Sequence, residues 1–167
     1  MNKLKNPKSD HYQRFKKSIL KEEFPWFHNS SNSTSPPFFS HRFIIRPEEG
    51  GWEKFPVSSS GFLKHAQYVV MEIINHNNIE VNCLLRMNLN LVYPHKGRQT
   101  TPIHVDHEYP HKNLLIYFTN GGGRIMMPEV NESFDPREDD VIGFDSTPHY
   151  IELPKRDFRI ALVTTYI

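Results

Sequence analysis

The feature that most constrains the fold is a succession of short strand-like segments that fills the second half of the chain without an intervening helix. Many of these segments alternate polar and apolar residues, and turn-forming residues such as Pro94, Gly97 and Pro110 separate them. The segments lie at residues 80–93, 100–106, 113–119, 123–127, 141–144, 149–153 and 158–166. About seven strands in succession predict an antiparallel sandwich or barrel, not a parallel nucleotide-binding sheet.

Two amphipathic helices are predicted ahead of these strands. Within residues 9–23, Tyr12, Phe15 and Ile19 recur at helical spacing with lysine and arginine between them. A second apolar pattern of helical period covers residues 62–74, and three serines precede it as candidate N-caps. The fold class predicted is therefore mainly β with flanking helices.

The chain of 167 residues is long enough for one hydrophobic core, and nothing in its composition marks a domain boundary. We expect a single domain over residues 1–167. In it, residues 1–60 supply a helix and a wrapping segment with a Ser/Asn/Pro-rich lid at 29–37, and residues 61–167 supply a helix and the strand core.

Charge and composition exclude several functions. The chain has 20 Lys and Arg against 19 Asp and Glu, a net charge of +1, so nucleic acid is not indicated as a partner. Apolar runs are too short to cross a bilayer, and we expect no membrane association. The single cysteine, Cys83, agrees with a reducing compartment and predicts a cytoplasmic protein. The sequence does not determine the oligomeric state.

Histidine and aspartate supply a candidate metal site. If residues 100–106 form a strand, His104 and Asp106 lie on the same face of it. His149 begins a later strand and can supply a third ligand. Two histidines and one carboxylate form the facial set that binds Fe(II) and leaves coordination positions open.

Arg159 is a candidate anion-binding residue. In the predicted strand 158–166, it shares a face with Ala161 and Val163, so its guanidinium is expected to be buried. A buried guanidinium requires an anion, either a bound carboxylate or the Asp or Glu of an internal salt bridge.

In the order and spacing of these residues, the sequence resembles the Fe(II)/2-oxoglutarate-dependent oxygenases. Within that superfamily it is most similar to the small prolyl-hydroxylase-like proteins of phages. The resemblance covers roughly residues 24–167 and rests on segments 24–27, 86–91, 104–106, 115–120 and 144–149 and on Arg159. It implies a double-stranded β-helix of jelly-roll, cupin-like type. If a phage encodes the chain, it implies that the protein is located in the cytoplasm of the host. It also implies Fe(II), 2-oxoglutarate and O₂ as cofactor and cosubstrates, with ascorbate as a candidate reductant.

The resemblance implies that His104, Asp106 and His149 are the iron ligands and that Arg159 binds the distal carboxylate of 2-oxoglutarate. Asn90 and Tyr93 are further candidates for cosubstrate binding, because the polar face of strand 80–93 could face into the barrel. The alternative is that this face is solvated, as is common in antiparallel sheets.

One departure argues against a prolyl hydroxylase. Residues 121–125 read Gly-Gly-Gly-Arg-Ile where many such enzymes have a Gly-Gly-x-Thr turn, and turn chemistry suffices to explain the three glycines.

Two other functions are considered. One is a non-catalytic jelly-roll that binds a metal or a partner; the other is a zinc hydrolase, for which Pro102 stands where a further histidine is required. The sequence does not identify the substrate, which is a small molecule or a side chain. It also assigns no role to His41, His107 and His111.

Overall fold

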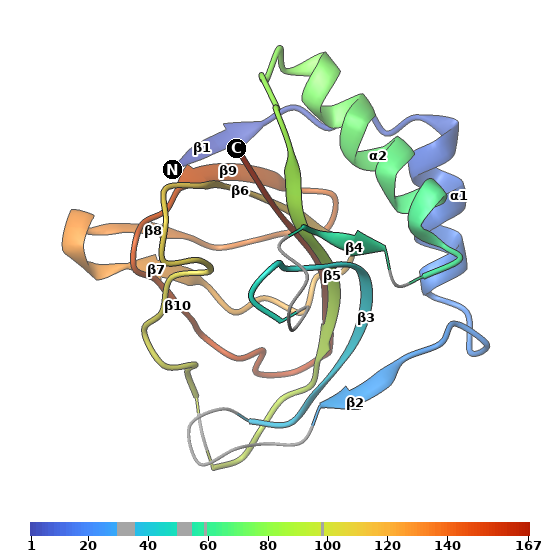
Figure 1. Ribbon diagram of the computed structural model, residues 1–167. Coiled ribbons are helices and arrows are strands. Elements are labelled where there is room, and N and C mark those ends of the chain that lie inside the picture. The colour runs from blue at the N-terminus through green and yellow to red at the C-terminus, as the bar shows by residue number, and fades with distance from the viewer. Residues whose placement is uncertain (30–35, 50–54, 59, 98) are drawn as a thin grey trace.

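The computed structural model describes residues 1–29, 36–49, 55–58, 60–97 and 99–167. Its main element is an eight-stranded antiparallel sheet in the order β1-β9-β6-β11-β5-β3-β2, with β4 paired to β3 (Figure 1). The strands are β1 Asn2–Leu4, β2 Phe27–Asn29, β3 Phe38–Ile45, β4 Val57–Ser58, β5 Leu84–Val92, β6 Lys112–Tyr117, β9 Val141–Asp145 and β11 Arg159–Tyr166. β1 and β3 show that residues 1–60 contribute strands to this sheet; most of the predicted lid, residues 30–35, lies outside the described residues.

A smaller sheet faces the large one. It has the order β10-β7-β8, and its strands are β7 Ile125–Met127, β8 Glu132–Phe134 and β10 Tyr150–Ile151, with the short 3₁₀ helix η1 Pro128–Val130 between β7 and β8. Ile125 and Met127 of the small sheet pack with Leu115 and Val163 of the large sheet in one buried cluster. Two antiparallel sheets packed in this way confirm the predicted jelly-roll, that is, a double-stranded β-helix.

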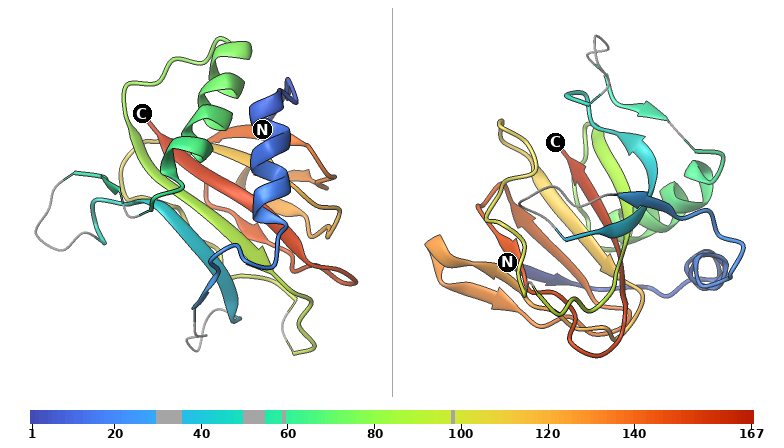
Figure 2. Two further views of the ribbon diagram at one scale, coloured as in Figure 1. Left: turned by 90° about the vertical axis from the view of Figure 1, so that its right-hand side faces the viewer. Right: turned by 90° about the horizontal axis from the view of Figure 1, so that it is seen from below.

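Two helices, α1 Asp10–Ile19 and α2 Leu63–His76, cover the other face of the large sheet (Figure 2). The apolar faces of both helices pack against alternate residues of β5, β6 and β11, such as Leu89, Ile116 and Leu162. Full burial of each such side chain contributes roughly 1.5–3 kcal/mol. Neither helix in the described part of the chain is long and apolar enough to cross a membrane.

Capping differs between the helices. The hydroxyl of Ser9 accepts from the Tyr12 N–H at 3.1 Å and caps α1. The N-cap residue of α2, Phe62, makes no side-chain capping bond; the Ser60 hydroxyl accepts instead from the Phe62 N–H at 3.0 Å.

Asp139, in the loop before β9, ties α1 to the sheet. Its Oδ1 accepts from the Tyr12 hydroxyl and from Lys16 Nζ, each at 2.6 Å. Burial by itself would raise the pKa of Asp139, but hydrogen bonds from Lys16, Tyr12 and Lys8 outweigh it and hold that pKa below its ordinary value of 3.8. The carboxylate is therefore stabilised in the folded state.

The prediction of a continuous strand over 100–106 is wrong. Only Thr100 and His104 form β-bridges, with Glu152 and His149 respectively, and the residues between them are irregular. Pro102 lies in this stretch and has no N–H to donate to a neighbouring strand, which accounts for the interruption. His104 and Asp106 therefore do not share the face of a regular strand.

Candidate metal and cosubstrate site

A cavity of about 490 Å³ lies between the two sheets. Its walls include five residues that the sequence singled out: Asn90, His104, Asp106, His149 and Arg159. They come from β5, from the irregular 100–106 segment, from the residue before β10 and from β11. The fold thus brings the predicted metal ligands and the predicted anion-binding arginine to one cavity.

His104 and His149 face each other across a backbone bridge. The N–H of each donates to the carbonyl of the other at 2.9 Å, and the ring centroids are 4.6 Å apart. His104 Nδ1 lies 3.0 Å from the Pro102 carbonyl, and His149 Nδ1 lies 2.9 Å from the Thr147 carbonyl. Because a carbonyl only accepts, each Nδ1 carries a proton, and this tautomer places the lone pair of the uncharged ring on Nε2, where a metal can bind.

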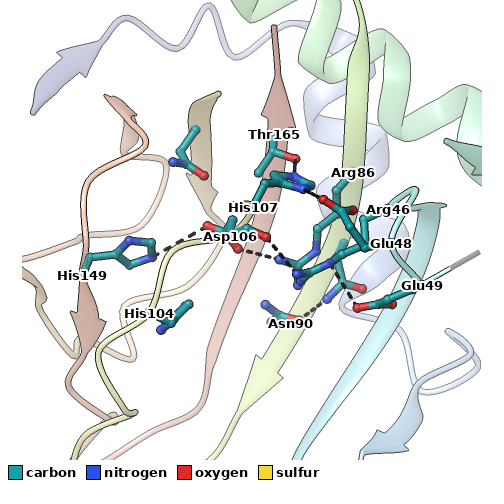
Figure 3. Close-up of polar contacts among 12 residues, drawn as sticks. Arg46, Glu48, Glu49, Arg86, Asn90, His104, Asp106, His107, His149 and Thr165 are labelled. Carbon is teal, nitrogen blue, oxygen red and sulfur yellow. Dashed lines mark hydrogen bonds and ion pairs between the residues drawn. The ribbon is translucent and has the colours of Figure 1, made fainter. Parts of the chain in front are cut away.

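Asp106 lies between His149 and two arginines (Figure 3). Its Oδ2 is 3.8 Å from His149 Nε2, and its Oδ1 accepts from Arg86 Nη1 at 2.7 Å. Its backbone carbonyl accepts from Arg46 Nη1 at 2.8 Å. Burial alone would raise the pKa of Asp106, but the Arg86 guanidinium and the neighbouring histidines hold that pKa below its usual value. The side chain is therefore a carboxylate at neutral pH.

The chemistry of these donors suits Fe(II), since two imidazole nitrogens and one carboxylate form its facial set. However, no group of three His, Cys, Asp or Glu side chains within the described residues is already arranged to hold a metal ion. The ion pair with Arg86 engages the Asp106 carboxylate, so a metal would have to draw this group and the two rings together. The assignment of the three ligands stays a prediction.

Arg159 is buried, with 5% of its surface exposed, and carbonyl groups hold it in place. Its Nη1 donates to the carbonyls of Gly122, Gly123 and Glu152 at 3.2, 3.0 and 3.1 Å. Among the described residues no carboxylate forms an ion pair with it, so the alternative of an internal salt bridge is not observed. Burial lowers the pKa of Arg159, but a guanidinium stays charged in proteins, so the cavity contains a cation with no carboxylate partner in the part of the chain that the structure describes.

The glycine turn of residues 121–123 is shaped around this arginine. A Cβ on Gly123 would lie 2.5 Å from Arg159 Nη1 and 2.3 Å from the Glu152 carbonyl oxygen, and the φ of Gly123 is +88°. A Cβ on Gly121 would lie 2.2 Å from the Phe158 carbonyl oxygen. Turn chemistry was therefore an incomplete explanation, because these glycines also allow close approach to the backbone around Arg159.

Asn90 and Tyr93 have different surroundings. Asn90 lines the cavity, and its Oδ1 accepts from Asn88 Nδ2 at 2.6 Å, which leaves the Asn90 NH₂ group available as a donor. Asn88 is 5% exposed, so this polar face of β5 is not solvated. Tyr93 is 52% exposed and packs against the rings of Phe39 and Phe158. The structure does not bring Tyr93 to the cavity.

Tyr117 is a cavity residue that we did not single out from the sequence. It pairs with Ala161 across β6 and β11 and lies on the wall near Arg159. Burial raises the pKa of Tyr117 to about 12, so its hydroxyl is a hydrogen-bond donor at neutral pH. Alternation in the 113–119 segment, which places Leu115 and Tyr117 on one face, was the available signal.

His107 supports the segment that carries Asp106. Its Nδ1–H donates to the Glu48 carboxylate at 2.9 Å, and its Nε2 accepts from the Thr165 hydroxyl at 2.8 Å. The His107 side chain is fully buried. His41 is likewise buried, and its ring nitrogens bond to the Pro25 carbonyl and to a serine hydroxyl, so it is a structural residue.

Comparison with solved structures finds several proteins with a similar fold. The chain is similar to a 2OG-Fe(II) oxygenase family oxidoreductase from Burkholderia pseudomallei, with TM-score 0.68 and 13% identity over 95% of this chain and 79% of that one. It is also similar to NgTET1 in complex with 5mC DNA (TM-score 0.54, 13% identity, 92% of this chain and 64% of that one). A third similar structure is a predicted oxalate decarboxylase from Thermotoga maritima (TM-score 0.50, 11% identity, 87% and 94%).

No family model matches the sequence, and no curated protein matches it significantly. The fold is thus similar to that of a 2OG-Fe(II) oxygenase family protein and of a predicted oxalate decarboxylase. Because one fold serves several chemistries, function must be argued from the site.

Proposed function

We propose that this protein is an Fe(II)- and 2-oxoglutarate-dependent oxygenase. It would couple the oxidative decarboxylation of 2-oxoglutarate to succinate and CO₂ with the hydroxylation of a second substrate. The observation that carries the proposal is the buried Arg159 cation, which has no carboxylate partner among the described residues and shares a cavity with His104, Asp106 and His149.

Each of these residues has a defined role in the proposal. His104 and His149, through Nε2, and Asp106 would hold the iron, which when bound supplies the oxidation chemistry with O₂. Arg159 would bind the distal carboxylate of 2-oxoglutarate through the guanidinium nitrogens that do not contact the glycine turn. The Tyr117 hydroxyl, next to Arg159 on the cavity wall, can donate a further hydrogen bond to that carboxylate.

The surrounding wall favours this use of the cavity. Leu115, Ala161 and Val163 line it beside Arg159 and give this part of the cavity an apolar wall. In such surroundings a charge pair is stronger than in water, and an unpaired charge is costly. A non-catalytic module that binds an anion could also use this guanidinium, and turnover distinguishes the two functions.

The decisive experiment combines binding and turnover. Anaerobic addition of Fe(II) and 2-oxoglutarate should give a weak charge-transfer band in the visible, and admission of O₂ should release succinate. Asp106→Ala should abolish both signals, while Asp10→Ala, on the outer helix layer, should change neither. Absence of the band and of succinate in the wild type, or full activity of Asp106→Ala with stoichiometric iron, would overturn the proposal. A zinc-dependent hydrolysis without the band would favour the hydrolase.

A further inference from the structure

The cavity has a second cationic region, formed by Arg46 and Arg86 (Figure 3). With Arg159, three guanidinium groups line the cavity, and Asp106 is the one carboxylate among the described lining residues. The cavity therefore has more positive than negative charge on its walls.

Arg86 and Arg159 are far apart along the sheet. On the paired strands β5 and β11, Arg159 is opposite Val92 and Arg86 is opposite Thr165. This register separates the two positions by six residues, or about 20 Å along the strand direction at ~3.3 Å per residue. Arg86 contacts Asp106, and Arg86 and His149 lie on opposite sides of that carboxylate (Figure 3). A small dicarboxylate held between the metal ligands and Arg159 would therefore leave the region of Arg46 and Arg86 to another molecule.

The existing partners do not neutralise both arginines once a metal is bound. Arg86 pairs with Asp106, which the proposed function assigns to the metal. Arg46 donates to a backbone carbonyl, and its Nε lies 3.1 Å from Glu49 but is buried without a well-directed hydrogen bond. The Glu49 carboxylate is 41% exposed and lies 3.2 Å from Arg42 as well, so it is shared.

Space for a ligand group exists at this position. A hollow of about 180 Å³ adjoins the main cavity, and Arg46 and Arg86 line both. Ser40 and Asn88 also line the hollow, and the Ser40 hydroxyl, which accepts from Asn29 Nδ2, can donate its own proton to an anion. Arg42 and the Glu49 carboxylate line the hollow as well. Among the described lining residues, three guanidinium groups therefore face one carboxylate, and this excess of positive charge suits a planar or tetrahedral anion, which arginine binds in a forked geometry.

We infer that the substrate of the oxygenase carries a carboxylate or phosphate group, and that Arg46 and Arg86 bind this group beside the metal ligands. The inference rests on the proposed function and names the chemical class of its second substrate. The competing explanation is that the two arginines only position Asp106. That role would make them important for metal binding, but it would give no preference between charged and neutral ligands.

The test uses protein loaded with Zn(II), which is redox-inert, and saturated with 2-oxoglutarate so that Arg159 is occupied. Calorimetric titration then compares N-acetylglycine and methyl phosphate with neutral N-acetylglycinamide; the first two identify which anion is preferred. We expect at least one anion to bind about ten-fold or more tightly than the amide, since hydrogen bonds to charged groups are the stronger ones. Arg46→Gln should weaken binding of that anion by about ten- to hundred-fold and leave the amide unchanged.

Two variants control this experiment. Arg46→Lys keeps the charge but loses the forked geometry, so it should bind the anion more weakly than wild type and more tightly than Arg46→Gln, which separates charge from folding defects. Arg14→Gln, on α1, removes one positive charge from the outer helix layer and should change nothing. The inference is overturned if neither anion binds the loaded protein, if the amide binds equally well, or if Arg46→Gln weakens anion and amide alike. Failure of the proposed function would be distinct, because 2-oxoglutarate would then not bind in the loading step.

Discussion

Replacing Arg159 with lysine separates a cosubstrate role from a structural role for this residue. Arg159 lines the cavity and uses Nη1 to contact three backbone carbonyls, whereas its Nε and Nη2 make no hydrogen bond within the described residues. A lysine ammonium is a single nitrogen, so it can satisfy the carbonyls or reach an anion but cannot do both in the same geometry. The variant should therefore fold and keep its metal, and it should bind 2-oxoglutarate poorly.

The size of the effect follows from the contacts. Loss of a forked, charge-assisted pair in a buried site typically costs about 2–5 kcal/mol. At about 1.4 kcal/mol for each factor of ten, this is roughly thirty-fold to several thousand-fold in the dissociation constant. The effect on stability should be small, because the ammonium can still donate to the carbonyls of the glycine turn.

Calorimetric titration of 2-oxoglutarate into the Zn(II)-loaded protein gives the dissociation constant, and urea unfolding of the metal-free protein gives the free energy of unfolding. Lys64→Arg, an exchange of the opposite kind at an exposed position of α2, is the matched control and should change neither quantity. If Arg159→Lys lowered the free energy of unfolding by several kcal/mol and left the affinity for 2-oxoglutarate unchanged, the residue would be a structural cation and the reasoning would be refuted.

Three further predictions concern the support of the site and the fold. Gly123→Ala should weaken 2-oxoglutarate binding and spare the metal, because the added Cβ would lie 2.5 Å from Arg159 Nη1; equal affinities in titration would contradict this. His107→Phe should lower the free energy of unfolding by about 1–3 kcal/mol, since the buried Thr165 hydroxyl loses its acceptor; a further change to Thr165→Val should recover part of the loss in urea unfolding. Asp139→Asn should destabilise the protein at pH 7 by about 1.5–3 kcal/mol. Because the folded pKa of the Asp139 carboxyl is lowered, its stabilisation is present above pH 3.8 and is lost as the pH falls through the folded value. In urea unfolding, the difference in stability between the variant and wild type should therefore shrink at acid pH. A difference that stays constant would argue against the ion pair.

The local period of the sequence predicted the strand that carries Arg159. Alternation in β11 placed Arg159, Ala161 and Val163 on one face, and the structure confirms it: all three line the cavity, and Ile160 and Leu162 belong to the core beneath the helices. This prediction succeeds because side chains of a strand alternate whatever the neighbouring strands are.

Other features of the site depend on the order of strands and could not be predicted in this way. The polar face of β5 had two interpretations, since a single strand does not reveal whether its sheet is covered on one side or on both. Arg86 lies on β5, which pairs with β11, and Asp106 lies in the irregular segment on the wall of the same cavity. Their contact therefore depends on tertiary structure and not on a local pattern. Likewise, Glu48 and Thr165 are distant in sequence from His107 and become its neighbours through tertiary structure.

The backbone bridge between His104 and His149 limits how a substrate can reach the proposed iron. Both imidazoles lie on segments that are held together there by two 2.9 Å hydrogen bonds, so parting these segments would displace two ligands at once. A path through that edge would release the metal at every turnover. We therefore expect substrates to enter and products to leave the cavity on its other side, which Phe38 and Arg46 line. Substitutions on that side should alter the choice of substrate and leave metal binding unchanged.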